Sequence, residues 1–413
     1  MGAGGTSSPL RERRFRLFWL GRATSAAGDA LVPVALSFAV LSINHSGLAL
    51  GGVLAAFTGS RVVFTLVGGV VADRFPRRSV MLVCDLTRAA VEAFTAAMLL
   101  THSMTLPLFF LTAALFGCAS AFFGPASDGL IPQVVSADNL QPANALLTLT
   151  RNFLNVFGPL VAGALIAAFS TGVVFAVDAV SFVASAIFLV LLEVDPHARA
   201  PRSHFITELR DGYREVVSRP WVRAPLVGFA LTNIGFASFL VLGPIVYSHH
   251  FDGARDWGIT SACGSVGAII GAIVSAKLAP RRPISAAFVA SILVALPIAA
   301  LARPFPLALI ALAWGIGMGS IALANTWWET TLQRRIPAMV FARVRSYDIL
   351  VSFVFMPVGM ILFGPLADHA GYENTLLIAA ALVAVTNVVV AFLPGVRAVT
   401  EAGSRKVSPL AVD

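Results

Sequence analysis

Twelve runs of roughly twenty mostly apolar residues dominate this chain of 413 residues. Hydrophobic residues make up 57% of the sequence and charged residues 12%, about half of the share that is typical of soluble domains. A helix needs about 20 apolar residues to cross the hydrocarbon core of a bilayer. The sequence therefore predicts a polytopic membrane protein and excludes soluble, disordered, collagen-like and disulfide-stapled classes.

Each of these runs is expected to be a transmembrane helix. Backbone groups in lipid must be hydrogen-bonded within their own segment, and barrel strands would alternate in polarity, which these runs do not. The first run contains Arg22 and Asp29 and is too long for a cleaved signal, so it is expected to be retained. The runs cover residues 16–41, 48–72, 78–100, 106–126, 146–169, 173–192, 224–247, 256–278, 284–303, 306–328, 346–367 and 373–393.

Basic residues in alternate loops set the expected orientation, because cytoplasmic loops carry the excess of Arg and Lys. The opposite loops hold only Arg255 and Arg303. Both termini are therefore expected in the cytoplasm, at a plasma (bacterial inner) membrane, and the net charge of +8 requires no nucleic acid as partner. The basic set comprises Arg11, Arg13, Arg14, Arg16, Arg74, Arg77, Arg78, six arginines within 199–223, Lys277, Arg281, Arg282, Arg334, Arg335, Arg343, Arg345, Arg397, Arg405 and Lys406.

Three short motifs recur in the two halves of the chain at offsets of 204 to 206 residues. Their common order predicts a parallel repeat about an axis along the membrane normal, with a cavity between the halves that opens to either side in turn. The motifs are Pro76-Arg77-Arg78 with Pro280-Arg281-Arg282, Ile131-Pro132 with Ile336-Pro337, and Phe157-Gly158-Pro159-Leu160 with Phe363-Gly364-Pro365-Leu366.

The repeat divides the chain into an N-terminal six-helix bundle (1–192), a cytoplasmic linker (193–223), a C-terminal six-helix bundle (224–395) and a cytoplasmic tail (396–413). The linker carries TELRDGYREVVSRP, which predicts an amphipathic helix on the membrane surface or a solvated linker helix. The expected fold is thus an all-α membrane protein with 12 transmembrane helices in two pseudo-symmetric bundles.

Motifs for nucleotide, metal or haem chemistry are missing from the sequence. Neither Lys277 nor Lys406 follows a glycine, so no phosphate-binding P-loop is present, and no HExxH motif occurs. Cys84, Cys118 and Cys263 are scattered through apolar runs and are expected to be packing residues. We expect no enzyme activity, no metal and no cofactor.

The loop at residues 69–78, GVVADRFPRR, resembles the signature loop of the major facilitator superfamily, with Pro76 in place of its second glycine. Further stretches are similar to a branch of that family, the macrolide-efflux, enterobactin-exporter and Tap-type drug exporters. The stretches are GDALVPVAL, FFGPASDGLIPQVV, FAVDAVSF, WETTLQRRIP and RVRSYD. The resemblance covers residues 15–395 and implies a secondary transporter that exports small amphipathic compounds.

Charged residues inside the spans are candidates for the proton pathway, since each costs at least about 2.5–3.5 kcal/mol to insert in lipid. Asp29 and Arg61 lie at matching depth on successive antiparallel spans. We expect an ion pair or a shared network there, in which the carboxylate exchanges a proton. A static pair that holds two helices together is the alternative.

The third span carries Asp85, Arg88 and Glu92 at spacings of three and four, which places them on one helical face. Glu92 is the second candidate proton carrier, whereas Asp85 and Arg88 are assigned to a cytoplasmic gate network together with Arg151 of the fifth span. Asp178 of the sixth span is assigned to the substrate path, and a structural role fits it equally well.

In the signature loop, the resemblance implies that Asp73 meets the N-terminus of the eleventh helix and that Arg74, Arg77 and Arg78 complete a lock between the halves. The second half has Lys277 in place of Asp73, so the lock would exist on one side only. Ordinary positive-inside loop charges would explain the arginines but not the aspartate.

Glycines mark two expected helix contacts. Gly158, Pro159 and Gly163 resemble the antiporter motif of the fifth helix, in which small residues allow close approach and proline bends the helix. Gly264, Gly267 and Gly271 in the eighth span form a small-residue face that is expected to pack against another helix.

These observations predict a monomeric, proton-coupled antiporter that moves a drug, an antibiotic or a siderophore-like compound across the lipid bilayer. The proton gradient is the expected energy source, and protonation of Asp29, with Glu92 as an accessory, is expected to bias the cavity between its two open states. A proton-coupled importer or a uniporter of a small metabolite would share this fold and is the alternative.

Overall fold

The structure, a computed structural model, is helical throughout its described residues, 8–194, 214, 216–303 and 305–400. Within these ranges, the side chains at 66, 70, 73, 338, 339, 342, 343, 346 and 349 are not described. No strand occurs in the described ranges, which confirms the expected all-α class. The expected amphipathic helix of the linker falls mostly outside them.

In the first half of the chain, the expected spans are all helices. The first of them is broken at Ala30 and Leu31, because Pro33 in the first turn of the next helix has no N–H to donate and its ring clashes with the preceding turn. The helices are α1 (Arg13–Asp29), α2 (Val32–Ile43), α3 (Gly47–Arg74), α4 (Arg77–Leu100), α5 (Leu106–Val134), α6 (Leu140–Ala168) and α7 (Thr171–Leu191).

The second half repeats this pattern with two interrupted spans. A single 3₁₀ turn, Ile292–Val294, interrupts the ninth span just before Pro297, and Phe355 interrupts the eleventh just before Pro357. The helices are α9 (Pro220–His250), α10 (Ala254–Lys277), α11 (Pro283–Ser291), α12 (Ala295–Ala302), α13 (Leu307–Arg335), α14 (Ala338–Val354), α15 (Met356–Ala370), α16 (Tyr372–Phe392) and the short α17 (Pro394–Arg397).

Eleven helical segments in the described part of the chain are long and apolar enough to cross a membrane. The helix of the third expected span, α4, is not one of them. Its 24 residues extend about 36 Å at 1.5 Å per residue, which is long enough. It is too polar because it carries Asp85, Arg88 and Glu92, and all three are buried. This helix can therefore cross the membrane without an apolar surface all round, because its charged side chains are buried inside the protein and do not face lipid.

The chain forms two compact units. The first unit comprises residues 1–201 and 247–262, and the second comprises residues 202–246 and 263–413. Residues 247–262 join the first unit because the first turns of α10 lie directly on α6: a Cβ at Gly258 would meet the carbonyl of Pro159, and one at Gly163 would meet that of Ala254. This grouping differs from the expected division at the linker.

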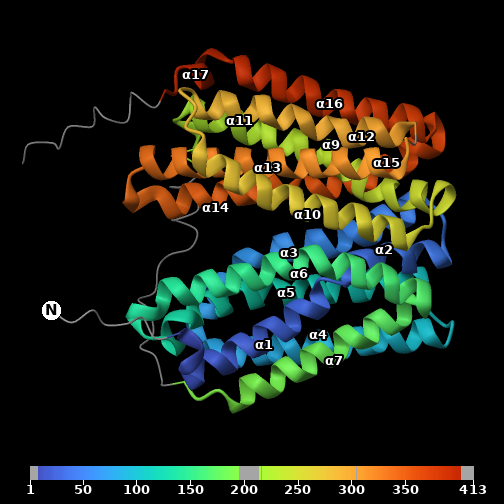
Figure 1. Ribbon diagram of the computed structural model, residues 1–413, viewed down its shortest axis with the longest axis vertical. Helices are drawn as coiled ribbons and strands as arrows, with labels where there is room; N and C mark the ends of the chain where they lie inside the picture. The colour runs from blue at the N-terminus through green and yellow to red at the C-terminus, as the bar shows by residue number, and fades with distance from the viewer. Residues whose placement is uncertain (1–7, 195–213, 215, 304, 401–413) are drawn as a thin grey trace, which may run out of the picture. The chain divides into compact units, whose positions relative to one another are not determined.

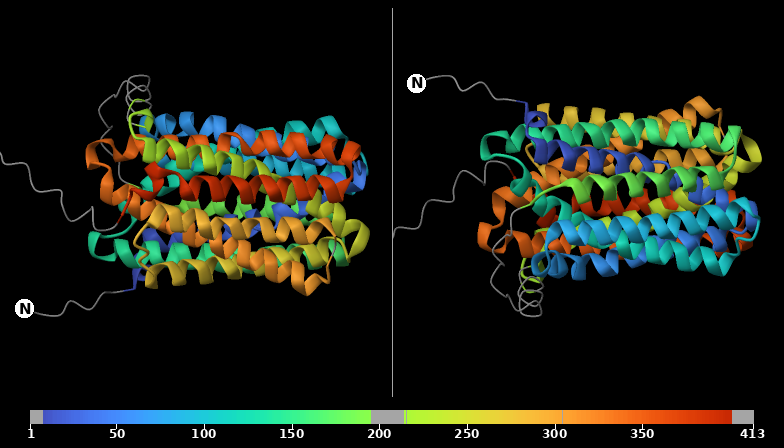
Figure 2. Two further views of the ribbon diagram at one scale, coloured as in Figure 1. Left: turned by 90° about the horizontal axis from the view of Figure 1, so that it is seen from above. Right: turned by 90° about the horizontal axis from the view of Figure 1, so that it is seen from below.

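In the first unit, α4 packs between α5 and α7, and α7 also packs against α1 (Figure 1; Figure 2, right). The core around Phe15, Phe18, Met81 and Leu130 joins these helices. The end at which α1 begins and α3 ends is called the basic end below. It carries Arg13, Arg74, Arg77 and Arg78.

In the second unit, α16 lies along α11 and α12, and both of these pack against α13 (Figure 1). The expected small-residue contact is present within this unit: a Cβ at Gly267 would meet the backbone of Gly315, and one at Gly271 would meet that of Gly319. This packing role of α10 is therefore confirmed.

Glu12 joins the start of α1 to the turn between α5 and α6. Its carboxylate accepts hydrogen bonds from the Ser136 amide at 2.9 Å, and from the Ser136 hydroxyl and the Asn139 side-chain amide at 2.7 Å each. Burial raises the pKa of Glu12, but these hydrogen bonds together outweigh it, so the pKa lies below its usual value.

The substitution Glu12→Gln should lower the melting temperature in detergent at pH 7 by about 1–3 °C. A carboxyl with a lowered pKa in the folded protein stabilises it above the unfolded pKa, and this stabilisation is lost as the pH falls through the folded pKa. The difference between wild type and variant should therefore shrink below about pH 4. A difference that grows on acidification would contradict this role of Glu12.

Candidate functional site

Four carboxyl side chains from three helices of the first unit gather around one arginine. Asp29 is the last residue of α1, and Asp178 lies on α7. Asp85, Arg88 and Glu92 come from one face of α4, as their spacing predicts. Three of the carboxyl residues are almost fully buried, with residue exposures of 0% for Asp85, 3% for Glu92 and 0% for Asp178. The side chain of Asp29 is 39% exposed.

Arg88 holds two of these carboxylates at once. Its Nη1 lies 3.3 Å from Asp29 Oδ2, and its Nη2 donates to Asp85 Oδ1. Asp85 is further fixed by the Ser185 hydroxyl of α7, which donates to Oδ2 at 2.7 Å. Charge-assisted hydrogen bonds of this kind compensate the cost of burying a charge.

The guanidinium of Arg88 is also enclosed by aromatic rings. It lies 4.2 Å from the ring centroid of Phe123 on α5 and 4.2 Å from that of Phe182 on α7. Such cation–π contacts are strongest when the cation is desolvated, and Arg88 is only 2% exposed. Arg88 therefore ties α4 to α1, α5 and α7 through a single side chain.

Glu92 and Asp178 each keep one buried carboxyl oxygen without a hydrogen-bond partner, Oε2 and Oδ2 respectively. The other oxygen of Asp178 accepts from the Ser181 hydroxyl at 3.2 Å. Gly28 of α1 packs directly against Asp178 and Ser181, since a Cβ at Gly28 would meet both side chains. The close approach of α1 to α7 buries Asp178 in the helix interface, which fits the structural role, and its assignment to the substrate path stays a prediction.

A small cavity of about 20 Å³ adjoins Glu92 and has room for about one water molecule. Thr95 of α4 and Thr112 of α5 also line it, among apolar side chains from α2, α3, α5 and α7. Both threonine hydroxyls donate to backbone carbonyls of their own helices, at 2.9 and 3.3 Å. Their remaining capacity is therefore to accept hydrogen bonds.

The expected ion pair between Asp29 and Arg61 is not formed; the cation that meets Asp29 is Arg88. Arg61 is exposed on α3, and its charge still acts on Asp29 over a longer distance. Matching depth on neighbouring helices does not fix which faces meet, and α4 presents its arginine at closer range. Asp85 and Arg88, which were assigned to a cytoplasmic gate network, lie in the cluster around Asp29, and their part in a gate stays a prediction.

The signature-loop arginines that the structure describes bind within their own unit. Arg77 donates to the carbonyl of Gly129 on α5. Arg78 donates to the carbonyls of Leu189 and Val190 at 2.7 Å each, where the last turn of α7 leaves acceptors free. These contacts lie within the first unit, and the expected lock between the halves stays a prediction. Arg74 is exposed, and the side chain of Asp73 lies outside those described.

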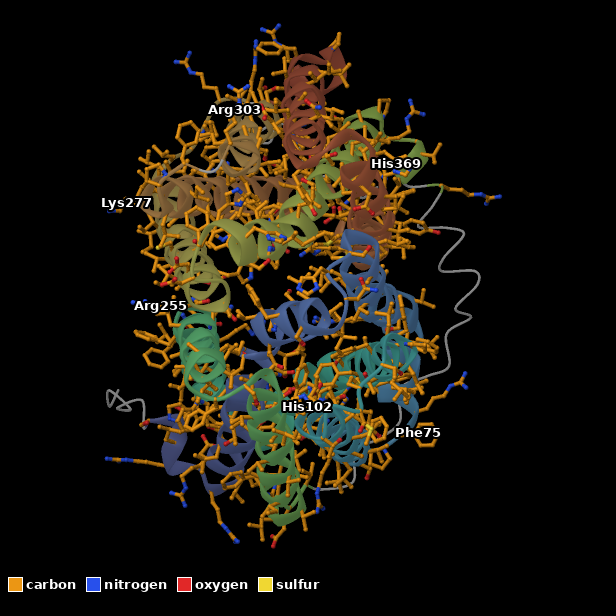
Figure 3. All side chains as sticks on the ribbon, turned by 90° about the vertical axis from the view of Figure 1, so that its right-hand side faces the viewer. Phe75, His102, Arg255, Lys277, Arg303 and His369 are labelled. Carbon is orange, nitrogen blue, oxygen red and sulfur yellow. The ribbon has the colours of Figure 1, made fainter. Side chains whose placement is uncertain are left out.

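Gly158 and Gly163 lie at close helix contacts, as the resemblance implied. A Cβ at Gly158 would meet Ala30, at the break between α1 and α2, and Gly163 faces the first turn of α10. That turn carries Arg255, which is seen beside α6 in Figure 3. The geometry thus explains why small residues stand here.

Two clusters of charged side chains were not predicted from the sequence. In the first unit, Arg22 of α1 donates to Ser127 and lies 3.3 Å from Asp128 Oδ1 on α5, and Arg151 of α6 is exposed nearby. The polar pair within FFGPASDGL was the signal for this contact, because a buried arginine in a span requires a carboxylate.

In the second unit, Arg345 binds Asp348 Oδ2 at 2.6 Å and Glu329 Oε1 at 3.0 Å, and the Trp328 indole donates to Asp348 Oδ1 at 3.1 Å. All four residues belong to the WETTLQRRIP and RVRSYD stretches. In the described ranges, no group of three His, Cys, Asp or Glu residues could hold a metal ion.

Comparisons with known proteins agree with this architecture. The family model described as transmembrane secretion effector matches residues 4–410. The chain is 28% identical over 393 residues to the multidrug efflux pump Tap of Mycolicibacterium fortuitum, covering 91% of this chain and 94% of that protein. It is 29% identical over 272 residues to the enterobactin exporter EntS of Shigella boydii, covering 64% of each.

Solved transporter structures share the fold. The nucleoside transporter NupG superposes with a TM-score of 0.73 at 14% identity, covering 92% of this chain and 97% of that one. A bacterial homolog of the human lysosomal transporter Spinster gives 0.72 at 15% identity, covering 97% and 98%. The expected superfamily, exporter branch and fold are therefore confirmed.

Removing Arg88 should strongly destabilise the first unit, because Asp85 and Asp29 would lose their shared counter-charge. We expect Arg88→Met to cost about 3–5 kcal/mol, in the range for one partner of a buried ion pair. The double variant Arg88→Met with Asp85→Asn should recover part of this loss, since it leaves fewer uncompensated charges. The measurement is thermal unfolding in detergent, and additive losses in the double variant would disprove the coupling.

Proposed function

Because the chain belongs to the transmembrane secretion effector family of the major facilitator superfamily, we propose that it exports small amphipathic compounds in exchange for protons. The names of its relatives, a multidrug efflux pump and an enterobactin exporter, support a drug, an antibiotic or a siderophore-like compound as substrate. The transporter works as a monomer by alternating access, with both termini in the cytoplasm of a bacterial plasma membrane.

The observation that carries the proposal is the charge balance of the cluster. Four carboxyl groups face one arginine, so the cluster would have a net charge of 1 − 4 = −3 if all of them were ionised. An unpaired buried carboxylate costs several kcal/mol. Arg88 compensates Asp29 and Asp85, whereas Glu92 and Asp178 each have an unpartnered oxygen. Glu92 and Asp178 therefore hold protons in this arrangement.

Asp29 is the group that exchanges its proton with water. It is the most exposed carboxyl of the cluster, and its contact with Arg88 is the longer of the two ion pairs. Protonation of Asp29 removes its attraction to Arg88 and leaves Arg88 to Asp85 alone. Since Asp29 ends α1 at the break before α2, this change acts at the point where the first span is already interrupted.

Coupling follows if the two open states of the transporter differ in their affinity for this proton and for the substrate. The state in which Asp29 binds Arg88 favours the ionised carboxylate, and a state that separates them favours the protonated acid. Glu92 is the accessory site, and a water molecule in its cavity would connect it to Thr95 and Thr112.

The test is proton-coupled transport in everted membrane vesicles, with a substrate first chosen from a drug-susceptibility panel in a pump-deficient host. Wild type should accumulate the compound when a pH gradient is imposed, and Asp29→Asn should reduce this accumulation at least tenfold (about 1.4 kcal/mol in driving interaction). Asp252→Asn, an exposed acid in the α9–α10 turn, is the matched control and should behave as wild type.

Full gradient-driven accumulation by Asp29→Asn would refute Asp29 as the exchanging group. Wild-type vesicles that move the compound without any dependence on the pH gradient would instead favour a uniporter, and accumulation in the opposite direction would favour an importer.

If Glu92 is protonated in the folded protein, replacing it by a neutral side chain of the same shape should leave the thermal stability almost unchanged. Glutamine imitates a protonated glutamate in shape and charge, so Glu92→Gln should unfold within about 2 °C of wild type. It should nevertheless lower the number of protons released per transport cycle if Glu92 acts as the accessory carrier. A loss of more than about 5 °C in Glu92→Gln, measured by thermal unfolding in detergent, would show that the ionised form is required.

A further inference from the structure

A second group of charged residues lies in the first unit, at about the same depth as Arg88. It consists of Arg22 on α1, Arg61 on α3 and Arg151 on α6. Arg22 has Asp128 as its counter-charge, at 3.3 Å. Arg61 and Arg151 are exposed and form no ion pair with the described residues. The proposed function uses neither Arg22 nor Arg151.

The three arginines stand at similar depth. Arg22 is nine residues from the start of α1, Arg151 is eleven from the start of α6, and Arg61 is thirteen from the end of α3. At 1.5 Å per residue these positions are about 14, 17 and 20 Å along their helices from the basic end. They thus fall within a band only about 6 Å deep, far inside the spans.

Arg22 and Arg151 are also close to each other laterally. The Trp19 indole donates to the Thr150 hydroxyl at 3.1 Å, which joins α1 and α6 at this level. Trp19 is one turn before Arg22, and Thr150 directly precedes Arg151. The charge of Arg151 acts on Arg22, as does the opposite charge of Asp128.

Two cations and one carboxylate leave this place with a net charge of 2 − 1 = +1. Charged side chains at this depth avoid lipid, so the exposed side of Arg151 is expected to face water and not hydrocarbon. The side chain of Asp128 is 73% exposed, and its Oδ1 lies 3.3 Å from Arg22 Nη1. Arg151 is exposed, and the side chain of Arg22 beside it is 15% exposed. Guanidinium groups that are incompletely neutralised in this way can bind an anionic oxygen group.

We propose that Arg22 and Arg151 bind the anionic group of the transported compound, and that its substrates are amphipathic organic anions such as carboxylates, sulfonates or phosphates. The inference rests on the proposed export function and adds the substrate class. Asp128 holds Arg22 when the site is empty, and the substrate anion takes its place. Arg61 extends the same positive field toward Asp29.

The experiment compares two probes that share one ring system, anionic 1-anilinonaphthalene-8-sulfonate and neutral N-phenyl-1-naphthylamine. The full chain is reconstituted in nanodiscs of zwitterionic lipid, and fluorescence titrations are corrected with empty nanodiscs. Arg151→Gln should weaken binding of the sulfonate about tenfold or more and leave the neutral probe within about twofold. Asp128→Asn should tighten sulfonate binding several-fold, because it removes the competing carboxylate.

Arg255→Gln is the matched control, because Arg255 is an exposed arginine of the same unit outside this group, and it should change neither affinity. The site is refuted if Arg151→Gln leaves sulfonate binding unchanged, weakens both probes equally, or acts no more strongly than Arg255→Gln. It is also refuted if wild type binds a cationic rhodamine dye more tightly than the sulfonate. The titration uses no gradient, so its failure and a failure of proton coupling are separate results.

Discussion

The burial of Arg88 is the constraint on which the first unit depends. A helix that carries three charged residues cannot face lipid, so α4 must be enclosed, and its neighbours are arranged accordingly. Phe123 and Phe182 cover the guanidinium, Asp85 and Asp29 neutralise it, and Ser185 completes the hydrogen bonds of Asp85. The contacts of α4 with α5, α7 and the end of α1 are therefore also the contacts that keep its charge compensated.

This arrangement places the titratable carboxyl of Asp29 at the break between α1 and α2. Asp29 is at once a ligand of Arg88 and the last residue before the break caused by Pro33. The second unit has no comparable cluster in its described residues: its buried polar side chains are mainly hydroxyls and amides, and Asp348 is its one buried charged residue. The two halves thus share helices and prolines, whereas all the buried charged residues of the described ranges except Asp348 belong to the first half.

Hydropathy predicted the helices well because lipid leaves the backbone no alternative, but it joined α1 with α2 and α14 with α15. The prolines that break these spans, Pro33 and Pro357, were visible in the sequence, yet a proline alone does not distinguish a kink from a break. The position of each charged residue along its helix correctly indicated that Asp29 lies near other charged side chains in the middle of the spans. It did not give the rotation of each helix about its axis, so Arg61 was chosen instead of Arg88. Contacts from Arg77 and Arg78 to backbone carbonyls leave no sequence signal at all.

The insufficient apolarity of α4 also bears on how the protein is assembled in the cell. A segment with a buried arginine and two buried acids partitions poorly into lipid by itself, and it needs α5 and α7 as partners. Since α7 begins at Thr171, it is synthesised long after α4 ends at Leu100. The polar face of α4 is therefore incompletely covered until α7 has been synthesised. Final closure of the first unit comes only when α7 arrives to cover the polar face.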